Sequence, residues 1–332
     1  MVNILIFRTD RIGDLLATCP TIVTIKDYFK NCSITLISSK KNTAYAKSLN
    51  IFDSVLEFPN NSILSKINFI KKIRKKKFSY TFVFDGKERS ILSASFIKSK
   101  FKVALTPKIK IYYRAFNIKY FEDSVSTSLN DIFQKALIYC QIDAKITNYN
   151  FLMSKKDNNF SDKISMKNYV HIHLDEKWFN NLYIKSYKNI NPNSDDFIDF
   201  INSIARKDNI LITTGLVEFG LIRHLNSNFF NKVSNKIYFK KNLNTSIYLI
   251  NKPSFEDIES LLRNSKILIS CHGAITHAAN SFNVKIIDII EENKKLIYKR
   301  FTAYLKKYSF VYRDNFDSIK ETLHNKIYEQ LI

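Results

Sequence analysis

Apolar runs alternate with stretches of helical periodicity along the first half of the chain. Short apolar runs, each suited to a buried strand, lie at Asn3 to Phe7, Ser33 to Ser38, Ser54 to Phe58, Thr81 to Phe84 and Lys102 to Leu105. Helices are predicted between several of these runs, and the one from about Ser62 to Lys77 carries Ile63, Ile67, Ile70 and Ile73 on one face. Strands that alternate with helices predict right-handed βαβ units and a mostly parallel sheet. The first half is therefore predicted to be a doubly wound α/β domain.

The second half shows the same alternation after a polar stretch, Ser154 to Lys167 (SKKDNNFSDKISMK), which predicts an interdomain linker. Predicted strands lie at Tyr169 to His173, Asn209 to Thr213, Ile267 to Ser270 and Val284 to Asp288, and predicted helices at residues 195–205, 256–262 and 274–281. The last segment places Phe316, Ile319, Leu323, Ile327 and Leu331 on one helical stripe. We therefore predict two domains of the same type, residues 1–160 and 161–314, and a buried terminal helix over residues 315–332.

The turn after the first predicted strand concentrates charge where α/β sheets bind ligands. The stretch NILIFRTDRIGDLLATCP reads as a strand, a tight turn and a helix start, and its turn holds Arg8, Asp10, Arg11, Gly13 and Asp14. In open α/β sheets the carboxyl ends of the strands face the ligand crevice. Asp14 would stand in the first helical turn, where the macrodipole favours a carboxylate that could take a proton from a bound hydroxyl. The alternative is that Asp14 only caps the helix while Arg8 and Arg11 are solvated.

Common nucleotide and metal motifs are missing from the sequence. The spacing of the turn is not GxGxxG, and no Gly-Lys-Ser or Gly-Lys-Thr follows, which excludes the dinucleotide fingerprint and the P-loop. No Asp-x-Asp follows a predicted strand, and Asp195 and Asp196 read as the first turn of a helix after Ser194. His171 and His173 share one face of a strand without an evident third ligand. The sequence therefore predicts chemistry without a metal and implies no cofactor.

Length and composition suit a two-domain protein. The 332 residues are comfortable for two domains, and no run reaches the roughly 18 apolar residues that a membrane span needs. Met1 leads directly into the first strand, so no signal peptide is expected and the predicted location is cytoplasmic. The four cysteines lack the spacing of a metal site or a disulfide framework. The five glycines are expected where the backbone needs a positive φ or a close approach to a ligand, and they are Gly13, Gly86, Gly215, Gly220 and Gly273.

The net charge of +22 predicts anionic partners, whether nucleic acid, a membrane surface or a phosphorylated substrate. The abundance of Lys, Asn and Ile is typical of A+T-biased coding, so part of the excess can carry no function. Two basic stretches, Lys71 to Lys77 and the aromatic-rich Lys108 to Phe121, suit the surface of an anionic bilayer. For the first, the alternative is that its cations only complement a helix C-terminus. No helix-turn-helix, zinc finger or RNP-like motif supports nucleic-acid binding.

The stretch IFRTDRIGDLLATCP resembles the N-terminal signature of glycosyltransferase family 9, the lipopolysaccharide heptosyltransferases and their relatives. The resemblance implies the GT-B architecture, which has two Rossmann-like domains facing a cleft and a terminal helix that commonly packs back on the first domain. It implies that Asp14 is the general base. The stretch VFDGKERSILSASFIKSKFKVAL resembles the family as well. An anionic glycolipid or glycan acceptor would then meet Arg8, Arg11, Gly13, Lys87 and Arg89.

Two stretches of the second half resemble the family's donor site. LITTGLVEFG resembles the strand and turn that contact the ribose of the donor, which implies roles for Thr214, Gly215 and Glu218. ISCHGAITHAANSFNVKIIDI resembles the segment that holds the diphosphate, which implies His272, Gly273, Ala274, Thr276 and His277. Aligned on His277, this chain has His272 where the family has Asp and Ala274 where it has Gly. Lys177, adjacent to Trp178, matches a phosphate-binding Lys. Taken alone, Glu218 reads as a first-turn acid and Lys177 as a surface residue.

Together the residues and the resemblance predict an inverting, metal-independent glycosyltransferase. It would move a sugar such as heptose from a nucleotide sugar to lipopolysaccharide or another surface glycan, in peripheral contact with the cytoplasmic face of the inner membrane. Two alternatives stay open. A non-catalytic GT-B-like protein that binds a nucleotide or a sugar is favoured by His272, and a basic nucleic-acid-binding protein would explain the charge.

Overall fold

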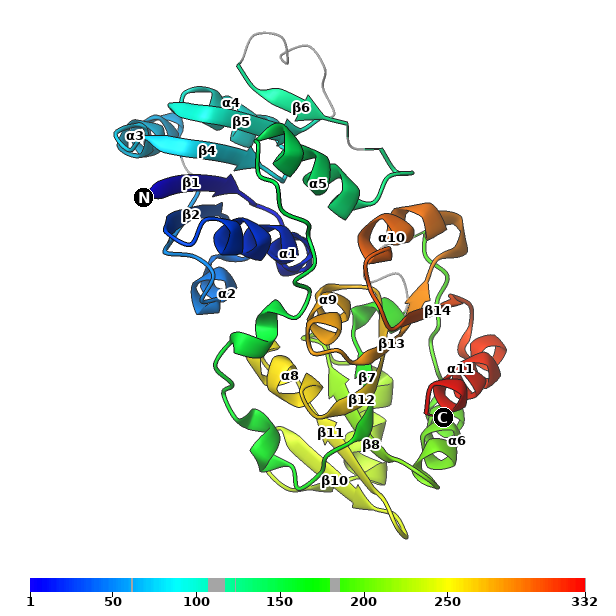
Figure 1. Cartoon of the computed structure of the whole chain (residues 1–332). Coiled ribbons are helices and arrows are strands. Elements are labelled where there is room, and N and C mark those ends of the chain that lie inside the picture. The colour runs from blue at the N-terminus through cyan, green and yellow to red at the C-terminus, as the bar shows by residue number, and fades with distance from the viewer. Residues whose placement is uncertain (61, 107–116, 123, 180–185, 332) are drawn as a thin grey trace. The chain divides into compact units, whose positions relative to one another are not determined.

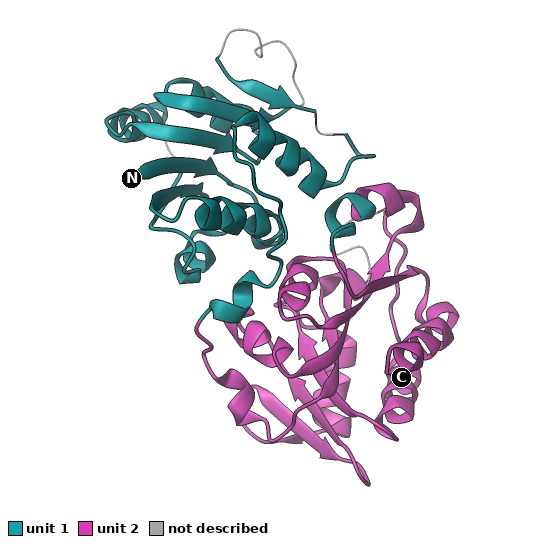
Figure 2. Ribbon diagram, viewed as in Figure 1, with its two compact units in different colours: residues 1–155, 299–304 teal, residues 156–298, 305–332 magenta. Residues whose placement is uncertain are grey.

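The computed structural model describes residues 1–60, 62–106, 117–122, 124–179 and 186–331. It divides into two compact units (Figure 2). Unit 1 comprises Met1–Lys155 and Lys299–Tyr304, and unit 2 comprises Lys156–Tyr298 and Leu305–Ile332. Each unit has its own sheet with helices on both faces (Figure 1), which confirms the predicted α/β class.

Unit 1 contains a six-stranded parallel sheet of order β3-β2-β1-β4-β5-β6. Its strands are β1 (Val2–Phe7), β2 (Cys32–Ser38), β3 (Ser54–Glu57), β4 (Phe78–Val83), β5 (Ser99–Leu105) and β6 (Lys119–Phe121). Its helices are α1 (Ile12–Tyr28), α2 (Thr43–Ser48), α3 (Ile63–Arg74), α4 (Glu88–Ser95) and α5 (Leu129–Tyr139). Helices α3 and α4 pack on one face of the sheet, and Figure 1 shows α1, α2 and α5 on the other. Most of the aromatic basic stretch, residues 108–116, lies outside the described residues.

Unit 2 contains an eight-stranded sheet of order β14-β13-β12-β7-β8-β11-β10-β9, in which β10 runs antiparallel to both of its neighbours. Its strands are β7 (Tyr169–Leu174), β8 (Asn209–Thr214), β9 (Asn231–Lys232), β10 (Ile237–Lys241), β11 (Ser246–Ile250), β12 (Ser265–Cys271), β13 (Lys285–Ile290) and β14 (Tyr308–Tyr312). Its helices are α6 (Ser194–Ala205), α7 (Gly220–His224), α8 (Phe255–Leu262), α9 (Ala274–Ser281) and α11 (Phe316–Leu331), while α10 (Lys295–Thr302) crosses the division between the units.

The six parallel strands of both sheets follow one order. In unit 1 the chain starts at β1, adds strands on one side and then returns to add β4 on the other side of β1. In unit 2 it does the same, with β7 as the first strand and β12 as the strand added after the return. Ligands of doubly wound sheets bind outside the carboxyl ends of the strands at this reversal. The residues after β1 and β4, and those after β7 and β12, are therefore the places to examine for function.

The terminal helix differs from the expectation that it packs back on the first domain. In α11, Phe316, Ile319, Leu323 and Ile327 join the apolar core of unit 2, together with residues of α6, β12 and β13. Its stripe covers one face of the second sheet, and this burial explains the periodicity. The late segment that belongs to unit 1 is Lys299–Tyr304, where Tyr304 stacks on Tyr149 with ring centroids 5.2 Å apart.

The polar stretch predicted to be a linker is anchored to unit 2. Within it, Phe160, Ile164 and Met166 are buried against Tyr169 and Leu261. The charged residues of the stretch hide these three apolar positions from a reading by composition. Within the part of the chain that the structure describes, every helix is too short or too polar to cross a membrane.

Candidate functional site

Arg8 binds the end of β1 to the start of α1 at the reversal point of unit 1. Its side chain is buried, its Nε donates to the Asp14 carbonyl at 3.0 Å, and its Nη1 donates to the Phe84 carbonyl beyond β4. Its Nη2 lies 3.7 Å from Asp14 Oδ1. The sequence predicted an acceptor contact for this guanidinium, but the structure occupies most of its donors with the protein itself. Arg8 therefore positions the turn and one carboxylate oxygen of Asp14.

Asp14 both caps its helix and remains accessible. It is the third residue of α1, and its Oδ2 accepts a hydrogen bond from the backbone N–H of Arg11 at 3.3 Å. Its side chain is 36% exposed, even though Arg8 lies beside the other carboxylate oxygen. The capping interpretation is thus correct for this residue, and it leaves part of the carboxylate free to meet a ligand.

Lys87 and Arg89 come from the turn after β4 and converge on Thr9, which follows β1. Lys87 Nζ pairs with Asp10 and donates to the Thr9 carbonyl at 3.0 Å. Arg89 Nη2 donates to Thr9 Oγ1 at 3.3 Å. The structure therefore brings these two predicted cations to the turn that carries Asp14. Gly13, also predicted here, occupies the second position of α1.

Asp85 is a half-buried carboxylate that was not predicted to belong to the site. It accepts hydrogen bonds from Thr9 Oγ1 at 2.6 Å, from Ser90 Oγ at 2.7 Å and from the backbone N–H groups of Thr9 and Lys87 at 3.2 and 3.1 Å. Burial raises the pKa of Asp85, while the Thr9 and Ser90 hydrogen bonds oppose that shift. Its position directly after an apolar strand was the available signal. Asp85 holds the two turns of unit 1 together.

Lys177 has the corresponding role in unit 2, where it joins the ends of β7 and β12. Its Nζ lies 2.8 Å from Asp175 Oδ2 and donates to the carbonyls of Cys271 and His272 at 3.1 and 2.9 Å. The adjacent Trp178 is wholly buried and donates from Nε1 to the His173 carbonyl at 2.9 Å. Lys177 therefore holds the loop after β12, which was predicted to bind phosphate. Its ammonium group lies at the base of that loop, paired with Asp175.

Two glycines of this region are required by close approach. A Cβ on Gly273 would lie 2.7 Å from Lys177 Nζ, and one on Gly215 would lie 3.0 and 3.1 Å from Asp175 Cβ and Cα. Neither glycine has a left-handed φ, which among the five glycines is found at Gly86, where φ is 58°. The expectation of a positive φ is therefore met at Gly86, whereas at Gly215 and Gly273 the close neighbours are protein atoms, those of Asp175 and Lys177.

Asp288 organises the loop after β12. Its side chain is wholly buried, and it accepts hydrogen bonds from Thr276 Oγ1 at 2.9 Å, from Ser270 Oγ at 3.3 Å and from His272 Nδ1 at 2.7 Å. Because an ionised carboxylate can only accept, Nδ1 of His272 carries the hydrogen of this bond. The loop is therefore built around one buried acid. Asp288 lies in β13, which is otherwise mostly apolar, and a lone acid in such a strand was a signal available in the sequence.

The remaining diphosphate candidates divide into buried and accessible groups. Thr276 is fully buried, and its Oγ1 also accepts from the Gly273 backbone N–H at 3.2 Å. His277 is buried with its ring edge-on to the ring of His272, at a centroid distance of 5.5 Å. His272, Gly273 and Ala274 are partly exposed and precede or begin α9. A ligand would therefore meet the backbone of this turn and the His272 ring.

Of the three residues predicted at the ribose, Thr214 at the end of β8 and Glu218 beyond it also differ in accessibility. Thr214 is buried, and its Oγ1 donates to Asn251 Oδ1 at 3.0 Å and accepts from the backbone N–H of Lys252 at 2.8 Å. Glu218 is exposed and lies 3.4 Å from Lys252 Nζ. Of these two side chains, that of Glu218 is the accessible one, and its Oε2 accepts a hydrogen bond from Lys252 Nζ at 3.4 Å.

The two histidines of β7 stabilise the interior of the sheet. His171 Nε2 and His173 Nδ1 both hydrogen bond to Thr213 Oγ1, at 2.7 and 2.9 Å. Burial lowers the pKa of His171 well below its ordinary value and that of His173 to about 4, so both rings are neutral at pH 7. Their arrangement on one strand face serves packing and hydrogen bonding.

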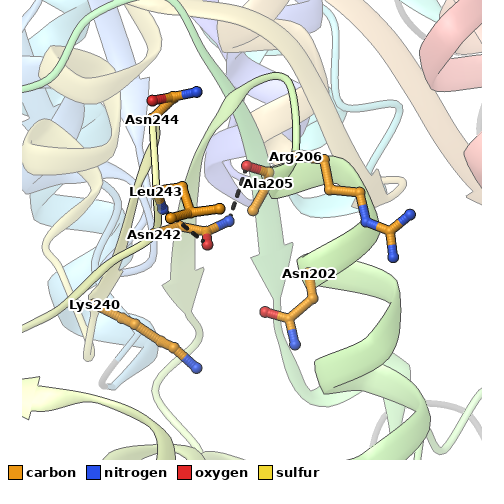
Figure 3. A pocket seen from close by; sticks show the side chains of 7 residues that line it. All are labelled: Asn202, Ala205, Arg206, Lys240, Asn242, Leu243 and Asn244. Atoms are coloured by element: carbon orange, nitrogen blue, oxygen red, sulfur yellow. Dashed lines mark hydrogen bonds between the residues drawn. The ribbon is translucent and has the colours of Figure 1, made fainter.

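A cavity of about 420 Å³ opens elsewhere on unit 2 (Figure 3). Its lining consists of Asn202, Ala205, Arg206, Lys240, Asn242, Leu243 and Asn244. These residues lie at the end of α6 and in the turn between β10 and β11, next to the amino ends of β8 and β11. The conserved geometry of doubly wound sheets places ligands at the opposite, carboxyl ends. This cavity is therefore separate from the candidate donor site.

Comparison with solved structures identifies the fold. The E. coli heptosyltransferase WaaC with ADP matches with a TM-score of 0.71 and 12% identity, over 99% of this chain and 100% of that one. The glycosyl transferase family 9 protein from Veillonella parvula DSM 2008 matches with a TM-score of 0.65 and 11% identity, over 98% of this chain and 89% of that one. The chain has the fold of these glycosyltransferases. The fold expected from the resemblance to family 9 is thereby confirmed.

The same fold also carries a different chemistry. The UDP-GlcNAc 2-epimerase from Methanocaldococcus jannaschii matches with a TM-score of 0.56 and 13% identity, over 98% of this chain and 92% of that one. No family model matches the sequence, and no curated protein matches it. The likeness at such low identity concerns the fold, so the reaction must be argued from the residues of the site.

Proposed function

We propose that this chain is an inverting glycosyltransferase that works without a metal ion and moves a sugar from a nucleotide sugar to a surface-glycan acceptor. The observation that carries the proposal is the accessible carboxylate of Asp14 at the reversal point of unit 1, with Arg8 beside it. The fold of the heptosyltransferases supports a transferase. Lipopolysaccharide is the acceptor class to test first, and heptose the first sugar.

In the proposed reaction, Asp14 takes the proton of an acceptor hydroxyl while the oxygen attacks the anomeric carbon of the donor. The bond from that carbon to the diphosphate breaks, the configuration at the carbon inverts, and the nucleoside diphosphate leaves with the electron pair. A carboxylate within hydrogen-bond reach of the hydroxyl is a suitable general base. Arg11, Lys87 and Arg89 would bind the anionic groups of the acceptor around this turn.

The donor diphosphate would bind the turn after β12. The first N–H groups of α9, with the partial positive charge of the helix N-terminus, suit a diphosphate. Lys177 adds a fixed charge below the turn, and the His272 ring lies at its surface. These groups would stabilise the leaving diphosphate in the place that a divalent cation takes in Asp-x-Asp enzymes. Glu218, exposed after β8, would accept hydrogen bonds from the ribose hydroxyls.

The experiment that tests the proposal is a donor screen followed by a transfer assay. Thermal shift against nucleoside diphosphates and nucleotide sugars should select one nucleotide, with ADP sugars tested first because the WaaC structure holds ADP. The selected donor is then incubated with delipidated and lipid-linked glycan acceptors, and NMR assigns the anomeric configuration of the product. A product of inverted configuration supports the proposal. Donor binding without transfer favours a binding protein. Epimerisation of the donor sugar would mean that the chain catalyses the reaction of the epimerases instead.

We also place the reaction at the cytoplasmic face of the inner membrane, because the acceptors of this class are lipid-linked. Peripheral contact with that membrane would bring the acceptor to unit 1. The net charge of +22 favours an anionic surface.

A further inference from the structure

Helix α3, whose isoleucines were predicted to share one face, exposes several of its apolar side chains. Ile63, Leu64 and Ile67 are 75%, 71% and 42% exposed. The side of the helix that packs on the sheet is formed by Ile70 and Ile73, of which Ile73 is buried. The first two turns of α3 thus expose large aliphatic groups to solvent. Neighbouring exposed apolar groups are typical of a surface that a membrane or a partner protein covers.

The rest of the same helix face is basic. Ile63 and Ile67 are followed at helical spacing by Lys71 and Arg74, so these four residues share one stripe. Lys72 and residues 75–77 are also exposed and basic. The sequence contains no Asp or Glu between Phe58 and Phe84, so no acidic side chain within this segment offsets the charge.

We propose that the outer face of α3 docks unit 1 onto an anionic phospholipid surface. Aliphatic groups at one end of the face would enter the acyl boundary, and the cations at the other end would lie among the headgroups. The exposed apolar groups are aliphatic, whereas a surface for single-stranded nucleic acid would offer aromatic rings for stacking. The inference goes beyond sugar transfer, because binding of this kind requires no turnover.

A line of side-chain contacts connects α3 with the candidate acceptor site of the same unit. The Phe69 ring lies 5.6 Å from the Phe58 ring, and the Arg89 guanidinium lies 5.7 Å from the Phe58 centroid. Helix α4, on the same sheet face, exposes Leu92 and Phe96 by 49% and 50%. A membrane bound to this side of unit 1 would therefore hold lipid-linked molecules close to the turn that Arg89 contacts.

The test is co-sedimentation of the full chain with vesicles of phosphatidylcholine, with and without phosphatidylglycerol, at low and high salt. Two triple variants separate the two parts of the face: I63S/L64S/I67S and Lys71→Gln with Lys72→Gln and Arg74→Gln. All six residues are exposed, so neither variant removes a core contact. Matched controls in unit 2 are Leu243→Ser, which is 94% exposed, and Lys232→Gln with Lys236→Gln and Lys241→Gln.

The wild-type chain should bind the vesicles that contain phosphatidylglycerol, more strongly at low salt. Each cation should contribute about fivefold to the affinity for these vesicles, so the loss of three should lower that affinity on the order of a hundredfold. The aliphatic triple should lower it by roughly tenfold or more at either salt concentration. The unit 2 controls should bind as wild type does. Nucleotide-sugar thermal shifts should be unchanged in every variant, so that failure of docking is distinct from failure of the donor site.

Three results would overturn the inference. The first is a wild-type chain that sediments with neither kind of vesicle. The second is a pair of α3 triples that bind as well as their unit 2 controls. The third is RNA binding that exceeds vesicle binding and survives the aliphatic triple, which would assign the basic face to nucleic acid.

Discussion

Replacement of Asp288 should destabilise unit 2 and should also weaken donor binding, because this carboxylate organises the loop after β12. The carboxylate is wholly buried and accepts hydrogen bonds from Thr276 at 2.9 Å, His272 at 2.7 Å and Ser270 at 3.3 Å. In Asp288→Ala all three donors lose their acceptor, and a buried polar group left without its hydrogen-bond partner costs about 1–3 kcal/mol. The loop that begins α9 should also lose its shape, so donor affinity should fall together with stability.

The conservative variant Asp288→Asn separates charge from shape. An amide oxygen can still accept from Thr276, but the amide nitrogen then faces His272 Nδ1, which must give up its hydrogen to accept. We expect a loss of about 1–2 kcal/mol for the weakened hydrogen bonds. The donor affinity should decrease because the His272 ring changes its tautomer at the surface of the diphosphate turn.

Urea unfolding followed by far-UV circular dichroism measures the stabilities, and titration calorimetry with the selected donor measures the affinities. Asp314→Asn is the matched control, since its carboxylate is exposed and pairs with Lys188 at 2.9 Å. Exposed pairs of this kind contribute little, so the control should unfold as wild type does. If Asp288→Ala unfolds at the same urea concentration as this control, the argument that one buried acid organises the loop is wrong.

Two further predictions concern the interior of unit 2. The pKa of His173 is about 4 in the folded chain against 6.5 when unfolded, and His171 is shifted in the same direction, so below pH 6.5 the unfolded chain takes up protons first. Stability should therefore fall as the pH decreases from 6.5 to 4, by up to about 3 kcal/mol for His173, and equal urea midpoints at pH 7 and pH 5 would contradict this. Gly215→Ala should lower the free energy of unfolding by about 1–3 kcal/mol, because the new Cβ meets Asp175 Cβ at 3.0 Å. Gly220→Ala is the control, since its new Cβ meets nothing within 4 Å and should be neutral or stabilising. Equal unfolding midpoints for the two variants would refute the crowding argument.

The fold was predictable because parallel strands that are buried on both faces appear in the sequence as continuous apolar runs. The predicted helix at residues 274–281 has the bounds of α9. Strands β10 and β11 were not predicted: β10 ends in two lysines, whereas β11 is a short apolar run, SIYLI, of the kind that predicts a buried strand. Helix α6 was expected to start after Ser194, and its cap is in fact Asn193, one residue earlier.

The site was less predictable, because periodicity shows which residues share a face but not what covers it. Ile63 and Ile67 follow the spacing of core residues and are exposed. Arg8 and Lys177 are charged residues beside strand ends, and the structure uses both to bind backbone carbonyls. Asp85 acquires one of its partners, Thr9, from a turn that is distant in sequence, which no local pattern encodes.

The measurement that tests the central claim most directly compares transfer and donor binding in Asp14→Asn. Asparagine can still accept the hydrogen bond from the Arg11 N–H, so the start of α1 should keep its cap while the base is lost. Transfer should fall by about 10²–10⁴-fold with the donor dissociation constant unchanged, and Asp27→Asn at the exposed end of the same helix should be fully active. Wild-type turnover in Asp14→Asn would contradict the account.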